Sequence, residues 1–362
     1  MKLLKYIPVV FSYPNDIIND DRDANVLQGG NKMNKKLKIF LGIILVLIVI
    51  AGGTFFGGKF YVKGKLSKIK TVEIPKAPAE IGIDTTKYKP DETVVKKGDS
   101  ITNILLLGID SRDPSSDSGR SDSIMILTID EKNDKLKITS IMRDSLVNID
   151  GHGQEKITHA HAYGGPLLTL KTVNQNYNMN IMNYVQVDFF SLAKVIDYIG
   201  GVDINVTADE VPLVNGYGIE VANIEKKKVV PISGPGLQHL SGSQAVAYSR
   251  IRHVGRDDFQ RTERQRTVLA VLFKELSTRK VTDIPGVVDQ IIPCVETSLK
   301  TDDIMNFAEY ILTHKMTNFD QTRLPYDDLY KDAMVNKMSV LTWDKQATID
   351  RLHTFIFGSK DK

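Results

Sequence analysis

The chain has 362 residues, of which 42% are hydrophobic and 25% charged, as in a folded protein rather than a disordered one. Its formal net charge of +3 is too small to indicate nucleic-acid binding by itself. The single cysteine, Cys294, excludes an intrachain disulfide and a cysteine-based metal cluster, and its apolar surroundings predict a buried, unreactive thiol.

Residues 39–58 form an uncharged stretch made mainly of Ile, Leu, Val, Phe and Gly. A helix rises about 1.5 Å per residue, so a stretch of this length spans about 30 Å, the thickness of a bilayer core. Lysines flank it on both sides. We therefore predict one transmembrane signal-anchor helix rather than a buried core helix.

The regions on either side of this stretch suggest its orientation. Lysines are similarly frequent before and after it, but residues 1–38 are short and the following region is long. This favours a cytoplasmic tail and an extracytoplasmic domain at the cell membrane. Met33 offers a second start, and we interpret residues 1–32 as a mis-annotated extension. Lysines and prolines predict a stalk over residues 59–98, and the globular domain occupies residues 99–362.

Three short apolar runs, residues 104–109, 124–129 and 136–142, open the globular domain. They are rich in Ile and Leu and are separated by turn residues, which is typical of buried strands. Residues 132–134, with the sequence KND, predict a hairpin between the second and third strands.

Charged side chains stand where these strands begin or end, namely Asp110, Arg112, Arg120, Asp122 and Arg143. Strand ends at one edge of an α/β sheet are common places for ligands. Carboxylates suit Mg²⁺, and guanidinium groups pair with phosphate oxygens two bonds at a time. The residues therefore favour a site for a divalent metal and a polyphosphate, with surface salt bridges as the alternative.

The next segment contains His159 and His161, which alternate along a predicted strand and would share one face. A zinc site on these two residues would need a third ligand, and none is evident nearby, so the sequence does not favour zinc. Pro166 then opens a predicted helix with Leu170 and Val173 on its apolar face.

Residues 183–187 and 202–206 are predicted strands separated by a helix that Asp188 caps and a Gly-Gly pair ends. This strand–helix–strand order predicts a parallel crossover in an α/β layer. Residues 207–235 are expected to form a long irregular excursion that includes a lysine run at 226–228.

A second group of arginines follows a short helix that begins after Ser241. Arg250 and Arg252 come after that helix, and a long helix then begins near residue 257. Asp258, Arg261 and Gln265 share one face of the long helix, either as a solvated face or as part of a shared anion site. Arg264 and Arg266 are expected to point to solvent. Residues 281–362 are predicted to alternate helices and loops.

Six segments between about residues 103 and 269 resemble the LytR-CpsA-Psr family of cell-wall assembly enzymes. They are NILLLGIDSR, GRSDSIMILTI, SIMRDS, VDFFSLAKVIDYIGGVDINV, LSGSQAVAYSRIRH and DFQRTERQRTVL, and they follow an apolar membrane segment. The resemblance implies a three-layer α/β/α domain around a mixed sheet. It also implies a single-span anchor with the domain outside the membrane.

The resemblance implies a phosphotransferase that uses Mg²⁺, with Mn²⁺ as an alternative. The substrate would be a glycopolymer, such as wall teichoic acid or capsular polysaccharide, carried on undecaprenyl pyrophosphate. The acceptor would be peptidoglycan, at the C6 hydroxyl of N-acetylmuramic acid, and the product a phosphodiester. No nucleic-acid partner is implied.

The resemblance also assigns roles to residues. Asp110 and Asp122 would hold the metal, and with Arg120 and Arg143 they would form the catalytic group. The residues assigned to the pyrophosphate are Arg112, Arg120, Arg143, Arg250, Arg252, Asp258, Arg261 and Gln265. Two other functions use the same features: a polyprenyl-pyrophosphate phosphatase, and a non-enzymatic envelope binding or regulatory protein. Analysis of the reaction products separates the phosphatase from a transferase. A cellular role that survives Asp122→Ala would indicate the non-enzymatic protein.

Overall fold

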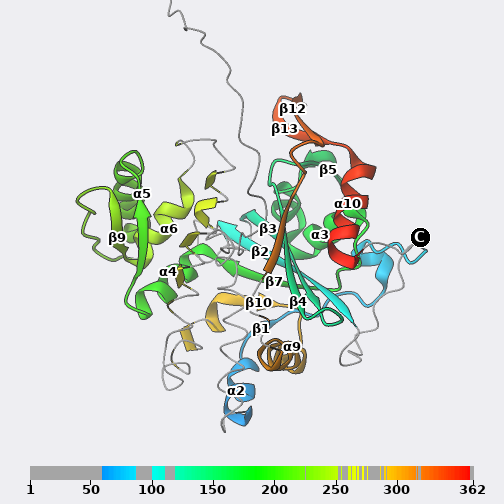
Figure 1. Ribbon diagram of the computed structural model, residues 1–362, viewed down its shortest axis with the longest axis horizontal. Coiled ribbons are helices and arrows are strands. Elements are labelled where there is room, and N and C mark those ends of the chain that lie inside the picture. Colours follow the sequence, from blue (N-terminus) through cyan, green and yellow to red (C-terminus); the bar gives the residue numbers. More distant parts are fainter. Residues whose placement is uncertain are drawn as a thin grey trace, which may run out of the picture. The chain divides into compact units, whose positions relative to one another are not determined.

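The computed structural model describes most of the chain from residue 59 to residue 358, as Figure 1 shows. The described ranges are 59–86, 100–110, 119–224, 226–251, 292–314 and 319–358, with residue 316 and separate positions between 254 and 290. The predicted tail and the predicted transmembrane stretch, residues 1–58, lie outside these ranges. Among the described residues, no helix combines the length and apolarity needed to cross a bilayer.

A seven-stranded mixed sheet forms the centre of the described structure. In spatial order its strands are β1 (Lys70–Thr71), β10 (Val295–Thr297), β7 (Asn183–Asp188), β2 (Ile101–Asp110), β3 (Arg120–Asp130), β4 (Lys135–Ile141) and β11 (Phe319–Leu324). Two-stranded sheets pair β5 (Leu146–Ile149) with β6 (Gly153–Lys156), β8 (Val202–Val206) with β9 (Gly236–Leu240), and β12 (Tyr330–Val335) with β13 (Met338–Trp343). The helices are α2 (Lys59–Leu66), α3 (His159–Tyr177), α4 (Phe189–Tyr198), α5 (Val211–Ile224), α6 (Gly242–Arg250), α9 (Thr301–Thr313) and α10 (Lys345–Phe357), with 3-10 turns at Pro78–Ile81 and Ile292–Cys294.

Both faces of the central sheet are apolar, and helices cover both of them. Along β2, Ile104 and Leu106 enter one core, while Leu105 and Leu107 enter the other. Side chains of α4, α6 and α9 complete the first core, and those of α3 and α10 complete the second. A strand buried on both faces reads as a continuous apolar run, which explains why its residues are apolar without alternation. The three predicted strands, the hairpin and the mixed-sheet α/β class are confirmed.

Part of the predicted stalk, residues 59–98, is folded into this domain. β1 pairs in parallel with β10 at the edge of the sheet. Leu66 and Ile69 are buried in the core on one face, and Ile81 and Ile83 are buried on the other. The described residues 59–86 therefore contribute to packing on both sides of the sheet.

The predicted parallel crossover between residues 183–187 and 202–206 is wrong. Both segments are strands, but β8 pairs antiparallel with β9 outside the central sheet. Val202 and its alternate neighbours along β8 are buried while Asp203 is exposed, so only one face of this strand is covered. Gly200 and Gly201 have φ values of 89° and 106°, which lets the chain turn away from the sheet after α4.

The predicted strand around His159 and His161 is also wrong, because both residues lie in the first turns of α3. Side chains at positions i and i+2 of a helix point in roughly opposite directions, so the two histidines do not share a face. Non-helical backbone at Gly164 and Gly165 interrupts α3, and Pro166 begins its second part as expected.

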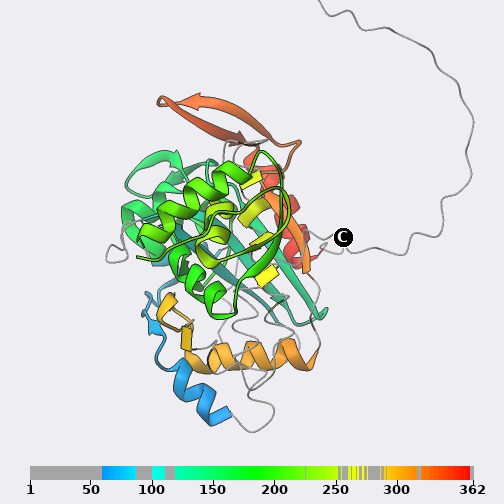
Figure 2. The ribbon, with the colours of Figure 1, turned by 90° about the vertical axis from the view of Figure 1, so that its left-hand side faces the viewer.

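Two further regions differ from expectation. The excursion predicted at residues 207–235 contains α5, whose start includes Pro212 at a position where helices tolerate proline. The C-terminal helices α9 and α10 are confirmed, but the intervening residues form β11, β12 and β13 rather than loops. β11 joins the central sheet in parallel with β4, and Figure 2 shows the β12–β13 hairpin extending away from it. Cys294 is half-buried, not fully buried as predicted.

Candidate functional site

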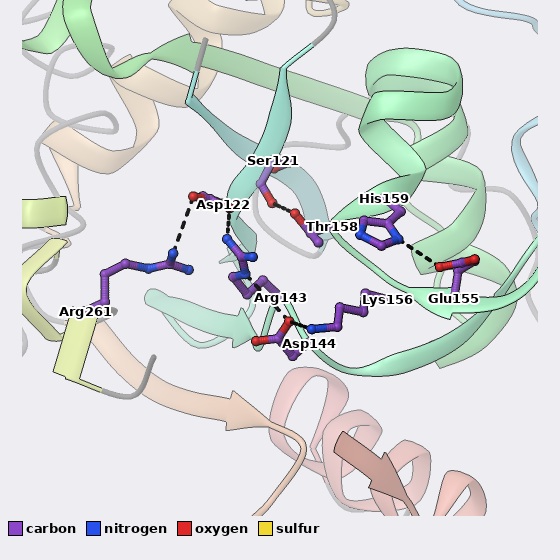
Figure 3. A network of polar contacts seen from close by, with 9 residues as sticks. All are labelled: Ser121, Asp122, Arg143, Asp144, Glu155, Lys156, Thr158, His159 and Arg261. Atoms are coloured by element: carbon purple, nitrogen blue, oxygen red, sulfur yellow. Dashed lines mark hydrogen bonds and ion pairs between the residues drawn. The ribbon is translucent and has the colours of Figure 1, made fainter. Parts of the chain in front are cut away.

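The carboxylate of Asp122 lies between two arginine side chains at the end of the central sheet where β3 begins and β4 ends (Figure 3). We call this end of the strands the sheet edge of the site. Nη1 of Arg143 donates a hydrogen bond to Oδ1 of Asp122, and Nη1 of Arg261 lies 3.4 Å from Oδ2. Asp122 is near the start of β3, and Arg143 follows the end of β4. Because β3 and β4 are antiparallel, the start of one and the end of the other meet at the same edge.

These three charged side chains are nearly inaccessible to water. The exposed fractions of the Asp122, Arg143 and Arg261 side chains are 7%, 12% and 2%. Two guanidinium groups and one carboxylate give these three side chains together a net positive charge, in a region of low dielectric constant. Such an arrangement attracts an anion that can accept several hydrogen bonds, and phosphate oxygens meet that requirement.

The backbone of the neighbouring strand brings the other predicted metal ligand to the same edge. Asp110 at the end of β2 pairs in register with Arg120 at the start of β3, after an irregularity between Gly108 and Ile109. Asp110 therefore lies on the strand adjacent to that of Asp122, two positions away in register. The side chains of Asp110 and Arg120 are outside the described part of the structure.

The second arginine group lies partly within the described residues. Arg250 is the last residue of α6, and its Nη1 lies 3.9 Å from Oε1 of Glu220. Gln265 is 5% exposed and stands four residues after Arg261 in helical backbone, so the two share a face as predicted. The predicted residues Arg112, Arg252 and Asp258 are outside the described ranges.

Arg264 is buried, which corrects the prediction that it points to solvent. Its Nε donates to Oε1 of Glu210 at 2.6 Å, and Nη1 and Nη2 donate to the carbonyl oxygens of Ile251 and Val254, each at 3.0 Å. Arg264 thus joins the helix of Arg261 to the segment that follows Arg250. Burial, reinforced by the charge of Glu210, raises the pKa of the nearby Tyr248 to about 12.

Asp144 and His161 make polar contacts near the start of β3 that the sequence did not predict. Asp144 lies 3.7 Å from Nε of Arg143 and accepts a hydrogen bond from Nζ of Lys156 at 2.7 Å. His161 donates from Nδ1 to the carbonyl oxygen of Gly119 at 2.6 Å, and it is 1% exposed. No spacing in the sequence points to the contact between His161 and Gly119, because it joins residues 42 positions apart.

The donor set at this edge fits a hard divalent cation. Mg²⁺ commonly takes one or two carboxylates from the protein and further oxygens from phosphate and water. Asp122 supplies one carboxylate, and Asp110 stands on the adjacent strand, with its side chain outside the described part of the structure. Within the described side chains no group of three His, Cys, Asp or Glu residues gathers, so a cation here would need oxygens from a bound phosphate.

Comparison with known proteins gives sequence relatives along nearly the whole described region. The chain is 30% identical over 298 residues to TagU of Bacillus mycoides, named a polyisoprenyl-teichoic acid–peptidoglycan teichoic acid transferase; the match covers 82% of this chain and 89% of TagU. It is 31% identical over 289 residues to TagT of Bacillus subtilis, which has the same activity in its name, covering 78% of this chain and 84% of TagT.

Solved structures show the same fold. TagT bound to LIIa-WTA has a TM-score of 0.54 and 26% identity, over 74% of this chain and 94% of that chain. TagT with bound octaprenyl pyrophosphate lipid has a TM-score of 0.51 and 25% identity, over 74% of this chain and 95% of that chain. Residues 61–353 match the family model named LytR_cpsA_psr. This match and the identity to TagT show that the chain belongs to the LytR-CpsA-Psr family.

Proposed function

We propose that this protein transfers a glycopolymer from a polyprenyl-pyrophosphate carrier to peptidoglycan and so forms a phosphodiester link. The observation that carries the proposal is the buried cluster of Asp122, Arg143 and Arg261 at the sheet edge. Its relatives TagU and TagT are named as transferases of this kind, and TagT has been solved with octaprenyl pyrophosphate lipid. The polymer class is teichoic acid or a related polysaccharide.

The arginines bind and orient the pyrophosphate. Each guanidinium group carries five N–H donors, and those of Arg143 and Arg261 converge on Asp122. Arg120 and Arg250 stand at the start of β3 and the end of α6, where they can extend the same anion site. The remaining proposed pyrophosphate contacts are Arg112, Arg252, Asp258 and Gln265.

The chemical step exchanges one oxygen substituent on phosphorus for another. The acceptor hydroxyl oxygen forms a bond to the phosphorus that carries the glycan, the bond from that phosphorus to the bridging oxygen breaks, and polyprenyl phosphate leaves. The hydroxyl proton passes to a base or to solvent. Negative charge grows on the departing phosphate, and fixed guanidinium groups stabilise it without reorganising.

We also propose that Asp110 and Asp122 hold Mg²⁺, or Mn²⁺ in its place. A divalent cation bound there supplies further neutralisation of the pyrophosphate charge. Asp122 would hold the cation through a carboxylate oxygen, and its contacts with Arg143 and Arg261 keep the carboxylate in one orientation. Chelation with EDTA is expected to stop transfer, and added Mg²⁺ to restore it; transfer unaffected by EDTA would contradict this assignment.

The location of the reaction follows from the proposed anchor. Residues 39–58 are proposed to span the cell membrane once, with residues 1–38 in the cytoplasm and the folded domain outside. This places the domain beside both a lipid-linked donor and the peptidoglycan acceptor. Protease treatment of intact cells tests the orientation, since the added protease can cleave the folded domain only if that domain lies outside the membrane.

The decisive test uses the full-length protein in detergent with a lipid-pyrophosphate-linked glycan, peptidoglycan oligomers and Mg²⁺, with products identified by mass spectrometry. A glycan joined to peptidoglycan through one phosphate is expected, and Asp122→Ala should abolish it. Asp328→Ala is the matched control, because Asp328 forms an exposed pair with Arg351. Free glycan phosphate would instead indicate a phosphatase, and intact bound lipid without product a binding protein.

A further inference from the structure

A group of aromatic side chains faces solvent close to the candidate site. We call it the ring cluster and define it as His152, His159 and Tyr163. The rings of His152 and Tyr163 stack with centroids 4.1 Å apart and planes inclined by 11°. His159 meets Tyr163 edge-on, with centroids 5.9 Å apart. Tyr163 is 44% exposed and His152 is also exposed, so these rings do not serve to fill the core.

The segment that carries the ring cluster is fixed to the start of β3 by hydrogen bonds. The hydroxyl of Thr158 donates to the carbonyl oxygen of Ser121 at 2.8 Å, and its N–H donates to that of Arg143 at 3.2 Å. Nδ1 of His161 donates to the carbonyl oxygen of Gly119 at 2.6 Å. The first turn of α3 therefore has a fixed position relative to the strand that presents Asp122.

This turn of α3 has two different faces. His161 is buried and points toward β3, while His159 and Tyr163, four residues apart, share the opposite, outer face. Nδ1 of His159 donates to Oε2 of Glu155 at 2.8 Å, which fixes its ring. Figure 3 shows Arg261 on one side of the Asp122–Arg143 pair and the Glu155–His159 pair on the other.

We propose that the ring cluster is a subsite for the sugar rings of the acceptor glycan; this rests on the proposed function. An acceptor must reach the pyrophosphate from a side that Arg261 does not occupy, and His159 of the ring cluster lies on the other side of the Asp122–Arg143 pair. Aromatic faces pack against the C–H faces of sugar rings, while neighbouring polar groups bind the hydroxyls. Here Gln154 and Glu155 are the neighbouring polar side chains on β6.

The composition of the surface favours a carbohydrate over a protein partner. Gln154, Glu155 and Lys156 separate His152 from His159 along the chain, so amide and charged side chains stand between two of the rings. Lys171 and Asp150 form a further exposed ion pair close to His152 in the chain, at 2.5 Å. Ordered polar groups around a few rigid rings suit a ligand that carries many hydroxyl groups.

A binding experiment tests the subsite without the lipid donor. The probe is a tetrasaccharide of alternating N-acetylglucosamine and N-acetylmuramic acid, freed of stem peptides, titrated into full-length protein and followed calorimetrically. Losing one ring contact in Tyr163→Ala or His152→Ala should weaken binding between about twofold and about tenfold. Tyr163→Phe should bind like the wild type. Tyr198→Ala is the matched control, because Tyr198 is a 48% exposed tyrosine on α4.

The transfer assay separates this proposal from the function on which it rests. Tyr163→Ala should raise KM for the acceptor by a similar factor and leave KM for the lipid donor and kcat unchanged. Transfer with an unchanged acceptor KM in both Tyr163→Ala and His152→Ala would overturn the subsite and leave the transferase function intact. A wild-type protein that binds the tetrasaccharide but only hydrolyses the donor would overturn the transferase and leave the subsite standing. No tetrasaccharide binding, or binding only when stem peptides are attached, would overturn the subsite.

Discussion

Arg143 reaches across the open end of the β3–β4 hairpin to Asp122, two residues beyond the last paired positions, Ile124 and Ile141. The antiparallel register, continued by two residues, places Asp122 and Arg143 opposite one another. A carboxylate and a guanidinium that face each other across a hairpin need no tertiary rearrangement to meet. Arg261 then reaches the same carboxylate from a distant helix, and this second contact completes the cluster of three charged side chains.

Replacing Asp122 should affect both activity and stability. In Asp122→Asn the two buried guanidinium groups lose their anionic partner, and we expect the free energy of unfolding to fall by about 1–3 kcal/mol. Transfer should be abolished because the proposed metal ligand is lost. Urea denaturation and the transfer assay measure the two effects. Full transfer by a folded Asp122→Asn protein would exclude this carboxylate from the reaction.

The geometry of Arg261 matters beyond its charge. Arg261→Ala should weaken binding of the lipid pyrophosphate by about 1.5–3 kcal/mol for each charged hydrogen bond lost. Arg261→Lys keeps the charge but removes the planar fork, so it should recover only part of that loss. Calorimetric titration with a short-chain polyprenyl pyrophosphate measures both. Equal affinity in Arg261→Lys and the wild type would show that charge alone is required.

Arg264 is expected to govern stability more than any surface arginine. Arg264→Ala leaves Glu210 buried at 5% exposure without its partner, and breaking a buried pair in this way costs about 3–5 kcal/mol. Arg351→Ala breaks an exposed bidentate pair with Asp328 and should cost much less, because water screens the interaction of exposed charges. Parallel denaturation curves compare the two variants. Equal losses would mean that burial of the Arg264 pair does not determine its contribution.

Asp130 should contribute to the acid sensitivity of the fold. Burial favours its protonated form, but hydrogen bonds from Lys137 and Asn133 and the charge of Lys137 outweigh burial and hold its pKa below the usual 3.8. A carboxyl whose pKa is lower in the folded state stabilises the fold above its unfolded pKa. That stability is lost as the pH falls through the folded pKa.

The corresponding measurement is the free energy of unfolding between pH 6 and about pH 2. We expect it to fall below about pH 4 in the wild type. In Asp130→Asn the fall should be smaller, because the residue that titrates has been removed. An identical pH profile in both proteins would assign the acid sensitivity to other carboxyl groups.

The sequence predicted the central strands well, because their physical signal is local. The apolar runs around residues 104–109 and 124–129 are buried on both faces, so their residues are apolar except for Thr128, and their ends are sharp. The charges at the strand ends are equally clear in the sequence, since Asp122 stands just before one apolar run and Arg143 just after another. The β8 strand was also found, but its partner was misassigned, because pairing depends on where the chain turns after Gly201.

The segments that the sequence missed lack such a signal. The residues of β11, FDQTRL, are mostly polar, and they form a strand because β4 offers a free edge with which to pair. The histidines of α3 were placed on a strand because two residues at alternate positions fit either structure over so short a stretch. Arg264 appeared to be one more charge on a polar helix face.

By itself, the sequence determined the mixed α/β class, the family and the identity of the charged groups at the sheet edge. These follow from apolar periodicity and from motif order along the chain. Only the tertiary structure decided which of those groups meet. Arg261 contacts Asp122, whereas Arg264, three residues later on the same helix, turns to Glu210. The reason is physical: a side chain's partner depends on what packs around it, and segments far apart in the sequence supply that packing.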